Sequence, residues 1–196
     1  MKSQSRLLLS VLAVCSLAVP GAIAEEAGDD AYYTLRRGDE LPPVDFKLED
    51  GTRITRQDLL GKFVVVDFWA TWCAPCVASF PKFNELEKIF ADRPVAFYSV
   101  TYESPEKIGP VLVQQPLETA IGFDNDFATF KSFSAWGIPA TYIFDPEGIL
   151  VSALHPDHLT AEVLEATLAG AIADVEQTHG WSDPAGAEEY FRSLVE

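Results

Sequence analysis

Cysteine is scarce in this chain of 196 residues, which has only Cys15, Cys73 and Cys76. Small exported domains that depend on disulfides carry several widely spaced cysteines, because closing a long loop contributes most to stability. Cys73 and Cys76 enclose only Ala74 and Pro75, so a bridge between them would contribute little to the fold. The cysteine content argues against a disulfide scaffold and favours a chemical role for this pair.

Positive charge is scarce as well. Fourteen Lys and Arg residues stand against 30 Asp and Glu residues, which gives a formal net charge of −16. An acidic surface repels nucleic acid and anionic membranes, so we expect neither as a partner. Hydrophobic residues make up 48% of the chain and charged residues 22%, which is typical of a soluble domain with a core of its own.

A long uncharged apolar run occurs only near the start, over residues 7–19. It is shorter than the ~20 residues of a membrane-spanning helix. Lys2 and Arg6 precede it, and Ala22-Ile23-Ala24 offers the small residues that a signal peptidase recognises. We predict that residues 1–24 are a cleaved secretory signal. Cleavage would remove Cys15 and leave 12 basic and 30 acidic residues, a net charge of −18. The alternative is an uncleaved segment that anchors the protein to the membrane.

Residues 25–40 are polar and acidic and predict a flexible leader. Hydrophobic periodicity and turn residues predict these elements after it: a hairpin of 44–48 and 52–54, a buried strand over 63–69, a helix over 75–91 kinked at Pro81, a strand over 94–100, a helix over 105–115, a strand over 119–123, a helix over 124–133, strands over 140–144 and 149–154, and helices over 160–177 and 185–195. This order predicts an α/β fold with a central mixed sheet covered on both faces.

The C-x-x-C pair follows a predicted buried strand and opens a predicted helix. A helix N-terminus carries partial positive charge and unpaired N–H groups, which stabilise a thiolate. Cys73 should therefore have a lowered pKa and act as the attacking sulfur. Cys76 lies one turn further along the helix, where it can attack a mixed disulfide formed at Cys73. Pro75 falls in the first turn, where its missing N–H costs nothing. The spacing favours thiol–disulfide exchange.

Asp67 lies six residues before Cys73 in an otherwise apolar strand. A bare carboxylate is costly inside a protein, and a buried carboxyl usually has a raised pKa. One interpretation is that Asp67 accepts the Cys76 proton when that thiol attacks the mixed disulfide. The other is that Asp67 faces a polar rim and only bonds to the backbone. The sequence does not choose between them.

The sequence VVVDFWATWCAPC, followed by Phe80-Pro81 and later by Gly137-Ile138-Pro139-Ala140-Thr141, resembles the thioredoxin superfamily. The similarity is closest to its exported TlpA/ResA-like thiol–disulfide oxidoreductases. The segment LPPVDFKLEDGTRIT, with LLGK after it, resembles the N-terminal hairpin of that branch, which ordinary thioredoxin lacks. The resemblance spans residues 41–175 and implies a thioredoxin fold with an N-terminal β-hairpin extension.

This resemblance implies a role for each residue of the site. Cys73 would be the nucleophile, Cys76 the resolving cysteine, and the two would form a redox-active disulfide. Pro139 would be a cis-proline facing that disulfide, and the backbone of Ile138 would hydrogen-bond a bound substrate segment. Trp72 would flank the site.

The sequence departs from the ResA-like pattern at two positions. Many ResA-like proteins have glutamate three residues after the second cysteine, where this chain has Ser79. Many also have asparagine where Asp67 stands, whereas Asp67 matches the buried acid of thioredoxin itself. We therefore expect an active site closer to that of thioredoxin than the N-terminal hairpin suggests.

The main alternative is a copper or other metal-binding chaperone on a thioredoxin-like fold. His155 and His158 supply two imidazoles, and cysteine with histidine suits copper(I) or zinc. Copper chaperones of this fold usually separate their cysteines by three residues rather than two, and His155-Pro156-Asp157-His158 falls in a turn of unconstrained geometry. We favour the redox function, with no cofactor and no metal at the site.

We therefore expect a signal peptide over residues 1–24, a leader over 25–40, a thioredoxin-like domain over 41–177 and a C-terminal extension over 178–196. The protein would be an exported monomer, most consistent with the periplasm, that exchanges disulfides with partner proteins. The resemblance implies reduction of those disulfides, with electrons supplied by a membrane-embedded donor.

Overall fold

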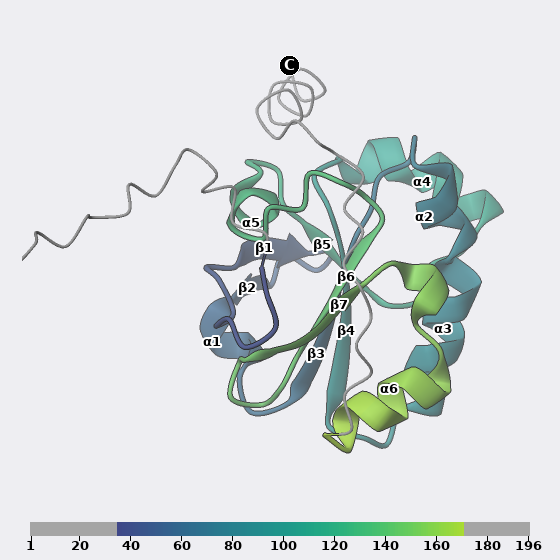
Figure 1. Cartoon of the computed structure of the whole chain (residues 1–196). Coiled ribbons are helices and arrows are strands. Elements are labelled where there is room, and N and C mark those ends of the chain that lie inside the picture. Colours follow the sequence, from purple (N-terminus) through teal and green to yellow (C-terminus); the bar gives the residue numbers. More distant parts are fainter. Residues whose placement is uncertain (1–34, 171–196) are drawn as a thin grey trace, which may run out of the picture. The chain divides into compact units, whose positions relative to one another are not determined.

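The computed structural model describes residues 35–170, which contain a seven-stranded mixed sheet (Figure 1). The strand order is β2-β1-β5-β4-β3-β6-β7, in which β3, β4 and β5 are parallel and all other neighbours antiparallel. The strands are β1 (Asp45–Leu48), β2 (Arg53–Thr55), β3 (Phe63–Phe68), β4 (Val95–Thr101), β5 (Ala120–Phe123), β6 (Ala140–Phe144) and β7 (Leu150–Leu154). The predicted mixed sheet and the predicted N-terminal hairpin are confirmed.

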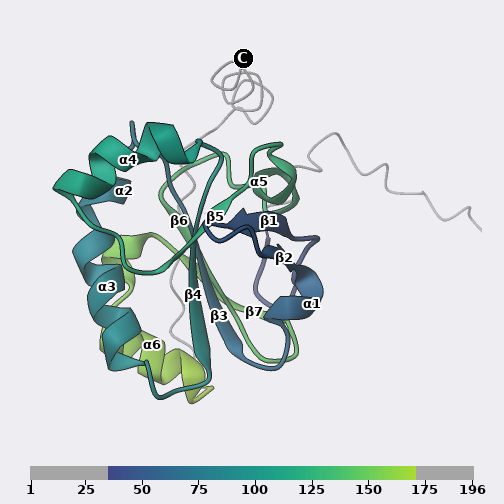
Figure 2. The same cartoon turned by 180° about the vertical axis from the view of Figure 1, so that it is seen from behind.

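Helices cover both faces of this sheet (Figures 1 and 2). On one side lie α2 (Ala74–Ala78), α3 (Phe80–Ile89), α4 (Pro105–Gln114) and α6 (Ala161–Leu168), and on the other α1 (Arg56–Leu59) and α5 (Ala128–Ser132). A short 3₁₀ helix, η1 (Pro156–His158), precedes α6. The layered arrangement is that of a thioredoxin-like fold, as the sequence indicated.

β3 lies inside the sheet between β4 and β6, and its run of apolar residues is buried on both faces. Val65 packs with α3 and α6, whereas Val64 and Val66 pack on the opposite side with Phe130 of α5 and the phenylalanines that flank this helix. Because alternate side chains point to opposite faces of a strand, a strand buried on both faces needs apolar residues throughout. Asp67 is the one exception within β3, and it is as buried as its neighbours.

The predicted helix over residues 75–91 is two helices. Ser79 keeps right-handed helical backbone geometry, but its N–H bonds the Cys76 carbonyl three residues back, so α2 ends at Ala78 and α3 begins at Phe80. The Ser79 hydroxyl donates a hydrogen bond of 2.6 Å to the carbonyl of Cys76, which satisfies a backbone acceptor at the end of α2. Pro81 lies in the first turn of α3, where a missing N–H costs nothing. The proline therefore begins a helix instead of kinking one.

The predicted helix over residues 124–133 is also shorter than expected. The buried Asp124 carboxylate accepts hydrogen bonds from the N–H groups of Thr129 (3.1 Å) and Phe130 (2.7 Å). These bonds hold the start of α5, and Phe127 just before it adopts left-handed backbone geometry with φ of 60°. The helical spacing of Phe127, Phe130 and Phe133 correctly identified buried side chains, but a turn carries the first of them.

The folded body includes residues that composition assigned to the polar leader. Leu35 is 7% exposed, and Glu40 forms an isolated β-bridge with Ile149. A single apolar side chain and one backbone pairing thus place residues 35–40 on the domain, ahead of the expected start at residue 41. The predicted helix over 160–177 is too long, because α6 ends at Leu168 and Gly170 follows in left-handed backbone geometry with φ of 75°. The predicted signal, the rest of the leader, residues 171–177 and the C-terminal extension lie outside the described residues. Within residues 35–170, no helix combines the length and apolarity needed to cross a membrane.

Candidate redox site

Cys73 and Cys76 are joined by a disulfide at the start of α2. Cys73 is the N-cap residue of the helix, and its sulfur accepts a hydrogen bond of 3.3 Å from the Cys76 N–H. Cys73 is 3% exposed and Cys76 is fully buried. Because α2 has only five residues, this local N–H group is the main electrostatic support that the helix can give to a Cys73 thiolate.

The loop before Cys73 is held by the loop that follows β4. The Thr71 N–H donates to Glu103 Oε2 at 2.6 Å, and the Thr71 hydroxyl donates to Glu103 Oε1 at 3.0 Å. The Glu103 side chain is 1% exposed and forms an ion pair of 2.9 Å with Lys107. Next to these residues, Trp72 Nε1 donates to the Tyr102 hydroxyl at 2.6 Å. Thr71 and Trp72, in the loop after β3, are thus fixed by Glu103 and Tyr102, in the loop after β4.

Tyr102 and Glu103 were not among the site residues that the sequence predicted. β3 and β4 are adjacent parallel strands, so the loops that follow them leave the same end of the sheet. The chain after β4 therefore had to pass near the chain after β3, which carries the cysteines. Only the sheet order shows that these two strands are neighbours.

Asp67 is fully buried in β3, and the interpretation that it faces a polar rim is wrong. Its Oδ1 accepts a hydrogen bond of 2.8 Å from the Thr141 hydroxyl, which lies opposite it on β6. Its Oδ2 has no hydrogen-bond partner among residues 35–170. Burial raises the pKa of the Asp67 carboxyl to about 8, and the Thr141 bond opposes this rise only in part. The group is therefore mostly protonated at neutral pH.

Ile138 and Pro139 lie at the same end of the sheet as the disulfide. The peptide bond between them is cis, and the next residue, Ala140, pairs with Phe68 at the end of β3. Ile138 packs against the apolar cluster that contains both cysteines. Trp72, which precedes Cys73, is 43% exposed. The fold thus brings together the cysteines and the other residues that the resemblance implied, with an exposed aromatic side chain at their edge.

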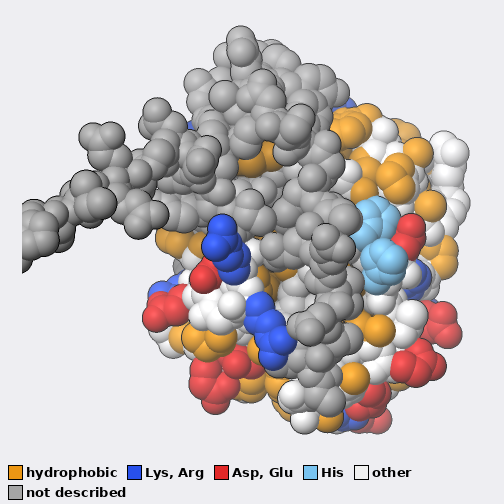
Figure 3. Space-filling model, in the orientation of Figure 1, with side chains coloured by type: hydrophobic (Ala, Val, Ile, Leu, Met, Phe, Trp, Pro, Cys, Tyr) orange, Lys and Arg blue, Asp and Glu red, His pale blue; other side chains and the backbone are white. Residues whose placement is uncertain are grey.

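The histidines of the metal-binding alternative lie on the surface, where Figure 3 shows them side by side in pale blue. Their ring centroids are 6.4 Å apart. His155 Nδ1 accepts a hydrogen bond from the Asp157 N–H at 3.2 Å, so this nitrogen serves the turn before α6. In the part of the chain described, no three or more His, Cys, Asp or Glu residues are grouped so that they could hold a metal ion.

A disulfide at the start of a helix, next to a cis-proline loop on a mixed sheet, is the site of a thioredoxin-like thiol–disulfide oxidoreductase. Comparison with known proteins identifies the family. The AhpC/TSA family model matches residues 37–153, and the chain belongs to that family.

Curated relatives have names consistent with this class. Thioredoxin-like protein YneN of Bacillus subtilis (strain 168) is 29% identical over 141 residues, which cover 68% of this chain and 79% of that protein. The thiol-disulfide oxidoreductase ResA of the same organism is 29% identical over 161 residues, covering 79% and 87%. The predicted resemblance and the oxidoreductase class are confirmed.

Solved structures agree. The crystal structure of a putative thiol:disulfide interchange protein DsbE from Chlorobium tepidum has a TM-score of 0.61 and 26% identity, and the match covers 71% of this chain and 99% of that one. The thioredoxin domain of a thiol-disulfide oxidoreductase from Bacteroides vulgatus has a TM-score of 0.60 at 22% identity, which supports the fold alone.

Proposed function

We propose that this protein is exported and reduces disulfides in partner proteins with Cys73 as nucleophile and Cys76 as resolving cysteine. The observation that carries the proposal is the disulfide at the start of α2, in which the Cys76 N–H donates to the Cys73 sulfur. In the reduced protein the same N–H would stabilise a Cys73 thiolate, the form that attacks disulfides.

The first step would form a mixed disulfide. The Cys73 thiolate attacks one sulfur of the substrate disulfide, a new S–S bond joins the two proteins, and the substrate's other sulfur leaves as a thiolate. That thiolate takes a proton from solvent. The exposed Trp72 ring and the backbone of Ile138, beside Pro139, would hold the substrate segment against Cys73 during this step.

The second step would release the substrate. The Cys76 sulfur attacks Cys73, the mixed disulfide breaks, and the substrate's second sulfur leaves as a thiolate that is protonated by solvent. The Cys73–Cys76 disulfide forms, so two electrons have moved to the substrate. The ionised form of Asp67, which is the minor form at neutral pH, would accept the Cys76 proton. Because burial raises the pKa of Asp67 to about 8, its ionised form is a stronger base than an ordinary carboxylate and takes a proton from a thiol at a lower cost in free energy.

Each further turnover would need a dithiol donor that reduces Cys73–Cys76 again, and we assign this role to a membrane-embedded electron donor. The apolar run over residues 7–19 and the small residues at 22–24 support export and cleavage after residue 24. If cleavage does not occur, the same segment would serve as an anchor. We propose the periplasm as the compartment, and a monomer in which one thioredoxin-like domain does the chemistry.

The experiment that tests the proposal is capture of mixed disulfides. Cys76→Ser leaves Cys73 able to attack but removes the sulfur that releases the substrate. We expect protein adducts of this variant that a reducing agent dissolves. The matched control is Cys73→Ser, which keeps a single cysteine in the motif but not the attacking one, and it should trap far fewer adducts. Equal trapping by both variants, or trapping by neither, would contradict the assigned roles.

A further inference from the structure

Three segments of the chain at the disulfide end of the sheet carry no charged residue. Residues 68–81, 108–117 and 132–144 contain no Asp, Glu, Lys or Arg, although these residues make up 22% of the whole chain. The first segment contains the cysteines, the second most of α4, and the third the cis-proline loop. In Figure 3 hydrophobic side chains gather at the end where Figure 1 labels α2 and α4, and acidic ones lie further from it, toward α3 and α6 and toward α1.

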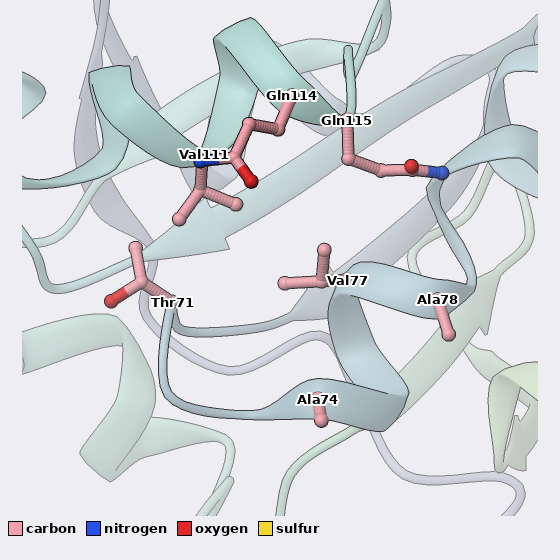
Figure 4. A pocket seen from close by; sticks show the side chains of 7 residues that line it. All are labelled: Thr71, Ala74, Val77, Ala78, Val111, Gln114 and Gln115. Atoms are coloured by element: carbon pink, nitrogen blue, oxygen red, sulfur yellow. The ribbon is translucent and has the colours of Figure 1, made fainter.

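Two of these segments form a cavity between α2 and α4 (Figure 4). Its volume is about 570 Å³. Val77 of α2 and Val111 of α4 extend into it from opposite sides, and the amides of Gln114 and Gln115 lie along its rim. The lining residues are Thr71, Ala74, Val77, Ala78, Val111, Gln114 and Gln115. None of them is ionisable, so a charge placed inside would have no partner on the walls.

The cavity, which we call the α2–α4 groove, adjoins the redox pair. Ala74, one of its walls, lies between Cys73 and Cys76, and Thr71 belongs to the loop that leads into Cys73. Glu103, whose carboxylate bonds Thr71 of that loop, forms an ion pair with Lys107. A segment seated in the groove would therefore be within a few residues of a disulfide placed at Cys73.

We propose that the α2–α4 groove binds an uncharged, apolar side chain of the substrate protein, a few residues from the cysteine that Cys73 attacks. This inference rests on the proposed function and adds a substrate class to it. The valine walls would bury the apolar side chain, and the glutamine amides can hydrogen-bond the backbone of an extended segment. An acidic or basic side chain would lose its water without gaining a counter-ion, so the groove selects against charge.

Two peptides test this selection. Each is a synthetic peptide with one internal disulfide, and the two differ only at one residue, which is Leu in one and Asp in the other. This residue is placed two, three or four positions from the first cysteine in successive peptide pairs. The full chain, reduced, is mixed with each peptide, and the rate is divided by its rate with hydroxyethyl disulfide, which is too small to fill the groove. We expect the Leu peptide to react at least about tenfold faster than the Asp peptide at the best position.

Two valines on α4 provide a matched pair of variants. Val111 lines the groove, whereas Val113 is 85% exposed and is not part of the lining. Val111→Asp should lose most of the normalised rate with the Leu peptide, and Val113→Asp should keep it. Val111→Lys should reverse the preference, because its ammonium group would pair with the Asp of the second peptide. A merely structural role for Val111 predicts no reversal.

The outcomes separate this inference from the proposed function. If reduced protein does not react with hydroxyethyl disulfide, the proposed function itself fails. If it reacts but treats the Leu and Asp peptides alike, or if Val111→Lys leaves the preference unchanged, the substrate assignment of the groove is overturned. A normalised Leu-peptide rate that falls as protein concentration rises would mean that a second copy of this chain fills the groove, and would also overturn it.

Discussion

Asp67→Asn should make the stability of this protein less dependent on pH. The wild-type carboxyl is protonated in the folded protein up to its pKa of about 8, whereas in the unfolded chain it ionises near the ordinary value of about 3.9. Between these values the unfolded state binds fewer protons than the folded state, so the free energy of unfolding falls as pH rises. The contribution of this protonation difference to the free energy of unfolding is fully present below about pH 4 and is lost by about pH 8.

The size of the effect follows from the same numbers. One titrating group changes the free energy of unfolding by about 1.4 kcal/mol per pH unit, which amounts to roughly 5 kcal/mol over the whole window. Asparagine does not titrate, and its amide oxygen can still accept the Thr141 hydroxyl. The variant should therefore gain stability relative to the wild type as pH rises, by about 3 kcal/mol between pH 5 and pH 7.

Urea unfolding of the oxidised proteins at pH 5, 6, 7 and 8 measures this difference without interference from free thiols. Asp124→Asn is the matched control, because burial raises the pKa of Asp124 to about 6 despite the N–H groups of Thr129 and Phe130. Its difference from the wild type should grow only up to about pH 6, whereas that of Asp67→Asn should grow up to about pH 8. Parallel curves for wild type and Asp67→Asn over this range would refute the buried, protonated carboxyl.

Three other results are expected. Asp67→Asn should slow release of the mixed disulfide more than its formation, measured by stopped-flow with a disulfide peptide; equal slowing of both steps would return Asp67 to a structural role. Glu103→Gln, which replaces one of the two carboxylate oxygens that bond Thr71, should destabilise the protein by about 1–3 kcal/mol in urea, whereas exposed Glu106→Gln should change little. Equilibration of the cysteines with glutathione or dithiothreitol should give a reducing potential, and a value near the ~−120 mV of a strong oxidant would exclude a reductant.

The local sequence predicted much of this site. A C-x-x-C directly after an apolar strand, with proline inside the pair, placed Cys73 at the start of a helix, and the structure has it as the N-cap residue. The run around Asp67 was apolar enough to imply a strand buried on both faces, although it could not say which way the carboxyl pointed. These inferences succeed because helix starts, turns and strand burial depend on residues only a few positions apart.

Errors in the prediction have a local cause too. At the break the Ser79 hydroxyl bonds the Cys76 carbonyl and Pro81 has no N–H to continue the helix, but serine by itself is equally compatible with an unbroken helix. The late start of α5 depends on the Asp124 carboxylate, which takes the N–H groups of Thr129 and Phe130. Hydrophobic periodicity indicates which side chains are buried, but it does not indicate which backbone groups form hydrogen bonds with polar side chains.

By itself, the sequence determined the redox pair, the mixed α/β fold and an acid in the strand before the cysteines. Only the tertiary structure decided that Thr141 holds this acid, that Glu103 holds Thr71, and that α4 closes a groove beside Ala74. These partners are separated by more than 30 positions in the chain, and they meet because β3 lies between β4 and β6. Strand order is set by how the whole sheet buries its two faces, so no short stretch of sequence could reveal those contacts.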